Sequence, residues 1–219
     1  MTVEASFKEF FNKQIEKLEQ WDQKLFLSFY NSRFSARTKK FSRYYSFFGN
    51  YFFWGALWLV MGIYAFFFTK DYYLFILFTG AFDQGFAIYL VIRYKIVNRN
   101  RPFITLNEHG VQQHDELIAE SKSFPSGHVT FFLYFGTVFA FYYQSWLILS
   151  IFIVLDIIMA VTRLILGVHF PVDVIFGFVF GLVFAFLYLG ITYPYWVAFY
   201  YWLGDLWQMI KAFFLGLLN

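Results

Sequence analysis

The sequence has no cysteine, and it has little proline and few charged residues. None of its 219 residues is Cys, four are Pro and 14% are charged, whereas a soluble domain typically carries about 25% charged residues. The absence of Cys excludes a disulfide framework and any Cys-ligated zinc or iron–sulfur site. The scarcity of charge excludes a globule that exposes its whole surface to water. The net charge of +3 is too small, and too unevenly spread, to indicate nucleic-acid binding.

Apolar side chains are abundant instead. They make up 60% of the chain, with 27% aromatic, which rules out intrinsic disorder. Residues 47–68 are 22 residues without a charge, enough to cross a hydrocarbon core of about 30 Å at about 1.5 Å per residue. The tail after Pro194 forms either a sixth span or an interfacial helix. The expected fold is all-α, an integral-membrane helical bundle of five to six transmembrane helices, with spans at 47–68, 72–92, 126–143, 146–166 and 174–193.

The N-terminal segment has a different pattern. Apolar side chains recur every three or four residues from Phe7 to Phe29, with Lys and Glu between them. This spacing predicts an amphipathic helix that lies on the membrane surface or packs against the bundle. An ordinary packing helix with no further task is the simpler alternative. We expect two parts, an amphipathic interfacial helix with a basic linker at 1–43 and a membrane-embedded domain at 44–219.

Counting membrane crossings places the polar segments. The loop 93–125 follows the second span and the linker 163–171 follows the fourth, so two spans separate them. Both segments must therefore emerge on one membrane face, and the N-terminal region lies on that face as well.

The residues Ser126, Gly127 and His128 stand at the start of the third span. Free backbone N–H groups and the positive end of the helix favour an anion there. Gly lets the backbone approach a ligand closely, and the Ser hydroxyl supplies another hydrogen bond. His128 is placed to pass a proton to a leaving group. The alternative is an N-cap followed by a histidine that anchors the helix at the interface.

A second group of polar residues follows the fourth span. Arg163 ends an apolar helix, where an unpaired charge costs about 2.5–3.5 kcal/mol, and its guanidinium suits a tetrahedral oxyanion. An ion pair with Asp156 is the structural alternative. His169 and Asp173 have the four-residue spacing of one helical turn, so the Asp can orient the imidazole as a nucleophile. With Arg101 as a further cation, these groups favour phosphoryl transfer through a phosphohistidine.

Three segments resemble the signature of the type 2 phosphatidic-acid phosphatase superfamily: Lys95…Arg101-Pro102, Pro125-Ser126-Gly127-His128 and Thr162-Arg163…His169…Asp173. The resemblance implies a bundle of about six membrane helices that hydrolyses lipid phosphate or diphosphate esters without a metal or other cofactor. It also implies that His169 is the nucleophile, Asp173 its orienting partner and His128 the general acid. The residues implied to cradle the phosphoryl group are Lys95, Arg101, Ser126, Gly127 and Arg163.

The first segment departs from the family pattern. Five residues separate Lys95 from Arg101, where the family usually has six. Tyr94 occupies the expected position, and Arg93 is the next cation. One residue corresponds to about 100° of rotation on a helix. Lys95 therefore points away from the phosphate if this segment is helical, and reaches it if the helix has unwound.

The resemblance thus predicts a membrane lipid phosphatase. Its candidate substrates are a polyprenyl diphosphate such as undecaprenyl diphosphate, phosphatidylglycerol phosphate, phosphatidate and lipid A phosphates. A phosphotransferase of the same superfamily is the alternative. A non-catalytic transporter is less favoured, because such a protein is expected to lose the site, and His128, Arg163, His169 and Asp173 are all present.

Two arguments about sidedness disagree. With the tail on the far face, the site-bearing face holds 15 of the 17 Lys and Arg, all but Lys70 and Lys211, and the positive-inside rule makes that face cytoplasmic. The resemblance implies the outer face of a bacterial plasma membrane. We favour the orientation that the resemblance implies.

Overall fold

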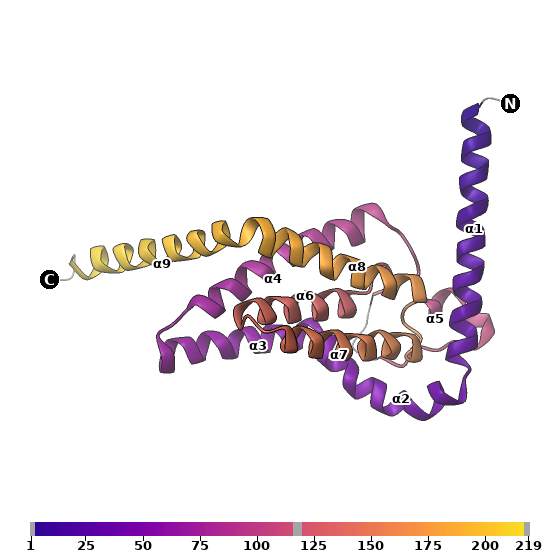
Figure 1. The fold of residues 1–219 in the computed structure, drawn as a ribbon, viewed down its shortest axis with the longest axis horizontal. Coiled ribbons are helices and arrows are strands. Elements are labelled where there is room, and N and C mark those ends of the chain that lie inside the picture. Colours follow the sequence, from indigo (N-terminus) through magenta and orange to yellow (C-terminus); the bar gives the residue numbers. More distant parts are fainter. Residues whose placement is uncertain (1–2, 116–119, 217–219) are drawn as a thin grey trace.

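The computed structural model describes residues 3–115 and 120–216, which are mostly helical (Figure 1). Four of the helical segments are long and apolar enough to span a membrane, and α6 is a shorter apolar helix between them. The five predicted spans therefore correspond to α3, α4, α6, α7 and α8. The helices are α1 (Val3–Tyr30), α2 (Arg33–Ser46), α3 (Tyr51–Tyr64), α4 (Tyr73–Val91), α5 (Pro102–Thr105), α6 (Gly127–Tyr142), α7 (Trp146–Ile165), α8 (Pro171–Leu187) and α9 (Tyr193–Gly216), with π turns at Ala65–Thr69, Ile92–Ile96 and Tyr188–Thr192 and 3₁₀ turns at Phe47–Gly49 and Asn107–His109.

The central helix of the bundle is α6. Ten of its 16 residues are buried, so α6 is surrounded by protein, whereas the other spans face lipid on one side. The ring of Phe135 lies 4.9 Å from that of Trp54 on α3 and 4.7 Å from that of Phe78 on α4. On α8, a Cβ at Gly177 would lie 3.0 Å from the Cβ of Val129. Small residues allow such close helix packing in membranes, and here they bring the start of α8 against the start of α6.

The C-terminal tail continues α8 rather than turning back. Residues 171–215 form one continuous helical segment, and α9 leads away from the end of the bundle that holds α1 (Figure 1). The tail is therefore not a separate sixth span. Pro194 cannot donate a backbone hydrogen bond, and it follows the π turn Tyr188–Thr192, which accommodates it without a break in the helix.

The N-terminal region covers one end of the bundle. Helix α1 lies across the direction of the spans, and only its C-terminal half reaches them (Figure 1). There Phe26 is buried against Phe170. The segment expected as a basic linker forms most of α2, because Ser32 caps its first turn and the buried Ser35, Ser42 and Ser46 present only small side chains to the bundle.

Candidate active site

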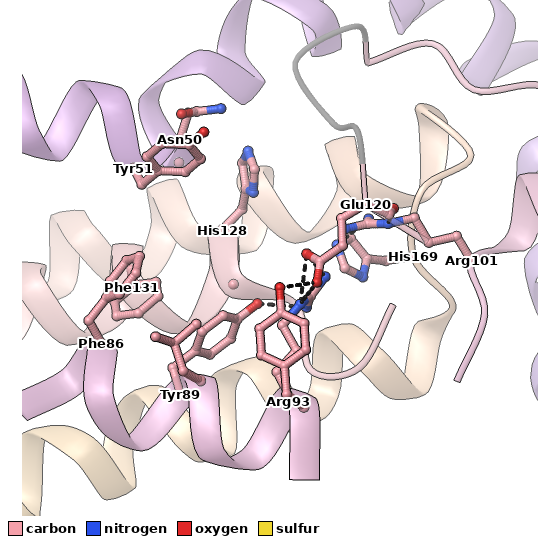
Figure 2. Close-up of a pocket in the computed structure, with 14 residues that line it drawn as sticks. Asn50, Tyr51, Phe86, Tyr89, Arg93, Arg101, Glu120, His128, Phe131 and His169 are labelled. Atoms are coloured by element: carbon pink, nitrogen blue, oxygen red, sulfur yellow. Dashed lines mark hydrogen bonds and ion pairs between the residues drawn. The ribbon is translucent and has the colours of Figure 1, made fainter. Parts of the chain in front are cut away.

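The three motif segments meet at the end of the bundle next to α1 and α2, as the crossing count predicts. They border a cavity of about 550 Å³. Figure 2 shows aromatic side chains of α4 and α6 on one side of His128, and Arg101 with His169 on the other. Arg93, Arg101, Glu120, His128 and His169 supply the polar part of the lining, and Tyr51, Phe86, Leu90 and Phe131 supply the apolar part. Tyr89 belongs to both, because its hydroxyl accepts from Arg93.

His169 lies in the turn between α7 and α8 and is 2% exposed. Arg101 Nη1 lies 3.2 Å from its Nε2. Because a guanidinium only donates, Nε2 accepts and the ring proton resides on Nδ1, which faces Asp173 Oδ2 at 3.7 Å. Burial lowers the pKa of His169 well below its ordinary value, and the cations Arg101 and Arg163 lower it further. The ring is therefore neutral at pH 7, with its lone pair on Nε2.

Asp173 is fully buried at the start of α8, and both of its carboxylate oxygens have a donor. The N–H of Phe170 donates to Oδ2 at 2.8 Å, and Arg99 Nη1 donates to Oδ1 at 2.8 Å. The N–H of Ser126 donates to the backbone oxygen of Asp173 at 3.0 Å. This bond joins the start of α6 to the start of α8, so the second and third motifs are held together.

Arg99 and Arg101 are placed by a short antiparallel contact. Asn100 forms an isolated bridge with Lys122, and the N–H of Ser123 donates to the Arg99 oxygen at 2.8 Å. Residues two apart on an extended segment point to the same side, so both arginines reach the turn between α7 and α8. Burial lowers the pKa of Arg101 to about 10, and it remains cationic at pH 7.

Arg163 is fully buried, and its partner is Asp115 rather than Asp156. Nη1 donates to Asp115 Oδ2 at 2.8 Å and to Ser46 Oγ. Burial by itself raises the pKa of Asp115, but Arg163, with smaller effects from its other neighbours, lowers it to about 2. Asp156 lies seven residues before Arg163, about 10 Å along the helix, so the ion pair considered from the sequence does not form.

Several buried polar atoms of the motif residues have no hydrogen-bond partner in the described part of the chain, and of these residues His128 and His169 line the cavity. Buried polar atoms without a hydrogen-bond partner are rare in proteins, so each one needs a physical explanation. Gly127 borders the same place, where a Cβ would lie 2.5 Å from Tyr89 Oη, so only Gly leaves room there. The unpartnered atoms that suit a tetrahedral anion and its reacting groups are Ser126 Oγ, His128 Nε2, and Arg163 Nε and Nη2. His169 Nδ1 also lacks a hydrogen bond, but it faces Asp173.

Lys95 does not reach this group, and of the two orientations left open by its spacing the structure has the one that points away. Its side chain is exposed and does not line the cavity, whereas Arg93 is 3% exposed and does. Arg93 donates to Tyr89 Oη at 2.7 Å and to Glu120 Oε2 at 2.9 Å. Seven residues separate Arg93 from Arg101, one more than the family's usual six. The π turn Ile92–Ile96 contains one more residue than an α turn and absorbs the difference.

Two acidic residues of the loop were not predicted from the sequence. Asp115 pairs with Arg163, and Glu120 pairs with Arg93 at 2.7 Å. Their only sequence signal is a position in the polar loop that precedes the second motif. Among the described residues, no group of three His, Asp or Glu side chains is arranged to hold a metal ion.

Two solved structures have a similar fold. The chain matches LpxE from Aquifex aeolicus with a TM-score of 0.60 and 23% identity over 76% of this chain and 93% of that one. It matches the first transmembrane PAP2 type phosphatidylglycerolphosphate phosphatase from Bacillus subtilis with a TM-score of 0.55 and 21% identity over 80% and 85%. No match was found among curated proteins. The model of the PAP2 superfamily matches residues 70–197, so the family predicted from the motifs is confirmed and this multi-pass membrane protein belongs to the PAP2 superfamily.

Proposed function

We propose that the protein is a membrane lipid phosphatase that works through a phosphohistidine at His169. One observation carries the proposal. A neutral imidazole with its lone pair on Nε2 lies at the polar end of a cavity whose opposite wall is apolar. Phosphoryl transfer needs the nucleophile and its surrounding cations, and a lipid chain needs the apolar wall.

The first step forms the phosphohistidine. Nε2 of His169 attacks phosphorus, and the bond from phosphorus to the leaving-group oxygen breaks. His128 gives its proton to that oxygen; the phosphate dianion beside it favours the protonated imidazole. The new imidazolium keeps its Nδ1 proton toward Asp173, whose negative charge stabilises it. The phosphoryl oxygens receive donors from Ser126, Gly127, Arg93, Arg101 and Arg163.

The second step releases phosphate. His128, now neutral, takes a proton from a water molecule, and the water oxygen attacks phosphorus. The bond from phosphorus to Nε2 breaks, so that inorganic phosphate leaves and His169 regains its lone pair. His128 returns to its protonated form, and the cycle is balanced in atoms and charge.

A lipid substrate follows from the apolar part of the cavity. Tyr51 of α3, Phe86 of α4 and Phe131 of α6 line the side away from His169 (Figure 2), and Leu90 of α4 also lines the cavity. A chain of methylene groups fits this wall, whereas a soluble phosphate ester leaves it uncovered. The similar structure of a phosphatidylglycerolphosphate phosphatase makes phosphatidylglycerol phosphate the first substrate to test, followed by phosphatidate and a polyprenyl diphosphate.

The test is phosphate release from these lipids by the purified protein in detergent with excess chelator. We expect release by the native protein and none by His169→Ala. Lys95→Gln is the matched control, since it removes an exposed charge near the same motif. Failure to release phosphate from any lipid, or release undiminished in His169→Ala, contradicts the proposal.

We also propose that α1 lies in the membrane interface beside the site, on the outer face of a bacterial plasma membrane. Phe7, Ile15, Leu18 and Trp21 are exposed on α1, and such a stripe suits the boundary between headgroups and acyl chains. Protease cleavage of an N-terminal tag in intact cells supports the outer face. Protection of the tag until the membrane is opened supports the cytoplasmic face that the charge distribution indicates.

A further inference from the structure

Asp22 is a buried carboxylate on the amphipathic helix α1. Its side chain is 0% exposed. Oδ1 accepts a hydrogen bond from the N–H of Val172 at 3.0 Å, and Oδ2 accepts one from Arg99 Nη2 at 2.5 Å. The first bond satisfies a free N–H at the start of α8. The second connects α1 to the segment that carries Arg101.

Arg99 joins Asp22 to the active site. Its Nη1 donates to Asp173 Oδ1 at 2.8 Å, and its guanidinium lies 4.3 Å from the ring centre of Phe170. Only 17% of the Arg99 side chain is exposed, so both ion pairs form largely out of water. Burial by itself lowers the pKa of Arg99, but Asp173 and Asp22 raise it above its ordinary value. A chain of contacts thus runs from Asp22 through Arg99 and Asp173 to His169.

The geometry explains why a second carboxylate is useful. Without Asp22, the guanidinium of Arg99 is able to take both oxygens of Asp173 in a bidentate pair. With Asp22 holding Nη2, Arg99 contacts only Oδ1, and Oδ2 remains directed at His169. The three side chains also carry two negative charges against one positive charge. That excess stabilises the positive charge that the imidazole gains when its Nε2 bonds to phosphorus.

We propose that Asp22 is a positioning residue of the reaction, which acts through Arg99 to hold Asp173 toward His169. Helix α1 is then part of the catalytic apparatus as well as a membrane contact. The inference rests on the proposed function and extends it to a segment outside the three motifs.

The test compares two charge-neutralising variants of α1. Asp22→Asn keeps an oxygen for the Val172 N–H but removes the charge, and we expect kcat to fall about tenfold, the lower end of the loss seen when the hydrogen-bond partner of a metal-ligating side chain is removed. KM stays within about twofold, because Asp22 makes no contact with the cavity. Glu19→Gln removes an exposed charge from the same helix and leaves both constants unchanged. Arg99→Lys keeps the charge but not the fork, so its kcat falls as well.

The dependence of kcat/KM on pH distinguishes two roles for Asp22, the positioning of Asp173 and the stabilisation of the fold. Loss of a negative charge lowers the pKa of His169, so the acid limb moves to lower pH in Asp22→Asn. A variant that only loosens α1 loses active protein without moving that limb. The charged and titratable groups that face His169 from the other elements are the same in both proteins: Arg93 in the π turn after α4, Arg101 in the loop, His128 on α6, Arg163 on α7 and Asp173 on α8.

Two results overturn the inference: a native kcat in Asp22→Asn, or a lower kcat with an unmoved acid limb. If the native protein releases no phosphate from any lipid, the proposed function fails by itself. The titration of His169, followed by NMR of ¹⁵N-labelled histidine in both proteins, then tests the link without activity. A lower His169 pKa in Asp22→Asn supports the inference, and an unchanged one contradicts it.

Discussion

Two regions of the molecule hold acidic or amide side chains among apolar helices, and they do so differently. At the active site, Asp173 and Asp115 are buried against the guanidinium groups of Arg99 and Arg163. Where α4 meets α9, Asp83 accepts from the hydroxyl of Tyr200, with no Lys or Arg paired to it in the described part of the chain. Neutral donors are sufficient to join two helices. Buried charge pairs are found where charge develops during the proposed reaction.

The α4–α9 contact also explains the polar residues in the second span. Gln84 lies next to Asp83, and its Oε1 accepts from Trp196 Nε1 at 2.7 Å and from Thr192 Oγ1 at 2.5 Å. Interhelical hydrogen bonds of this kind contribute about 0.6 kcal/mol each. The two regions therefore differ in what a single substitution is expected to change, catalysis in the first and a small amount of stability in the second.

The largest effect is expected from Arg163→Lys. Lysine keeps a positive charge near Asp115 but lacks the Nε and Nη2 donors, which have no partner in the described residues. Loss of such donors to a developing charge typically costs about 10²–10³ in rate, so kcat should fall by that factor while the protein stays folded. Phosphate release and the midpoint of thermal unfolding in detergent measure the two quantities. An activity within about fivefold of native would mean that Arg163 has only a structural role.

Arg93 and Lys95 offer a matched pair two residues apart. Arg93→Gln removes a cation that lines the cavity, and Lys95→Gln removes an exposed one. A hydrogen bond to a charged group contributes about 1.5–3 kcal/mol, so kcat/KM should fall about 10–100-fold in the first variant and stay unchanged in the second. The reverse order would show that Lys95 contacts the phosphate in the working enzyme.

Asp115→Asn tests the buried pair of Asp115 and Arg163 through stability. A pKa lowered from 3.8 to about 2 corresponds to about 2 kcal/mol. Because the folded-state pKa is the lower one, this stability is present above pH 4 and is lost as the pH falls toward 2. Asp115→Asn should therefore be less stable than the native protein at pH 7, and the difference should shrink at acid pH. Glu108→Gln, an exposed change in the same loop, serves as the control.

The smallest effect is expected from Tyr200→Phe at the α4–α9 contact. The variant loses one hydrogen bond to Asp83, which costs about 0.6 kcal/mol of stability, and kcat should not change. A large loss of activity would show that α9 is coupled to the active site, and the contrast between the two regions would then fail.

Much of the fold follows from local sequence. Hydrocarbon thickness sets the length of an uncharged run, so the residues of α3, α4, α7 and α8 lie close to the predicted spans. The pair His169 and Asp173 follows from helical spacing, because both stand at the start of one helix. The continuity of α8 and α9 does not follow from local sequence. A proline that begins a new helix and a proline that follows a π turn within one helix look the same in the sequence, so Pro194 does not distinguish the two cases.

The site contacts that were missed depend on the loop and on α1. Arg163 pairs with Asp115, a residue 48 positions away, while Asp156 on the same helix is too far along the axis. Arg93 enters the cavity because a π turn changes the helix register, and no residue in 92–96 predicts that turn from the sequence. Asp22 meets Arg99 across 77 positions. Periodicity describes one helix at a time, so contacts between distant segments lie outside what it can predict.

The proposed mechanism requires that His169 carries the phosphoryl group during the reaction. The direct test is to mix the purified protein with ³²P-labelled lipid phosphate, quench it in alkali because phosphohistidine is labile to acid, and map the labelled peptide. We expect label on His169 in the native protein and none in His169→Ala. Phosphate release by a protein that never carries label at His169, or label at another residue, would contradict this mechanism.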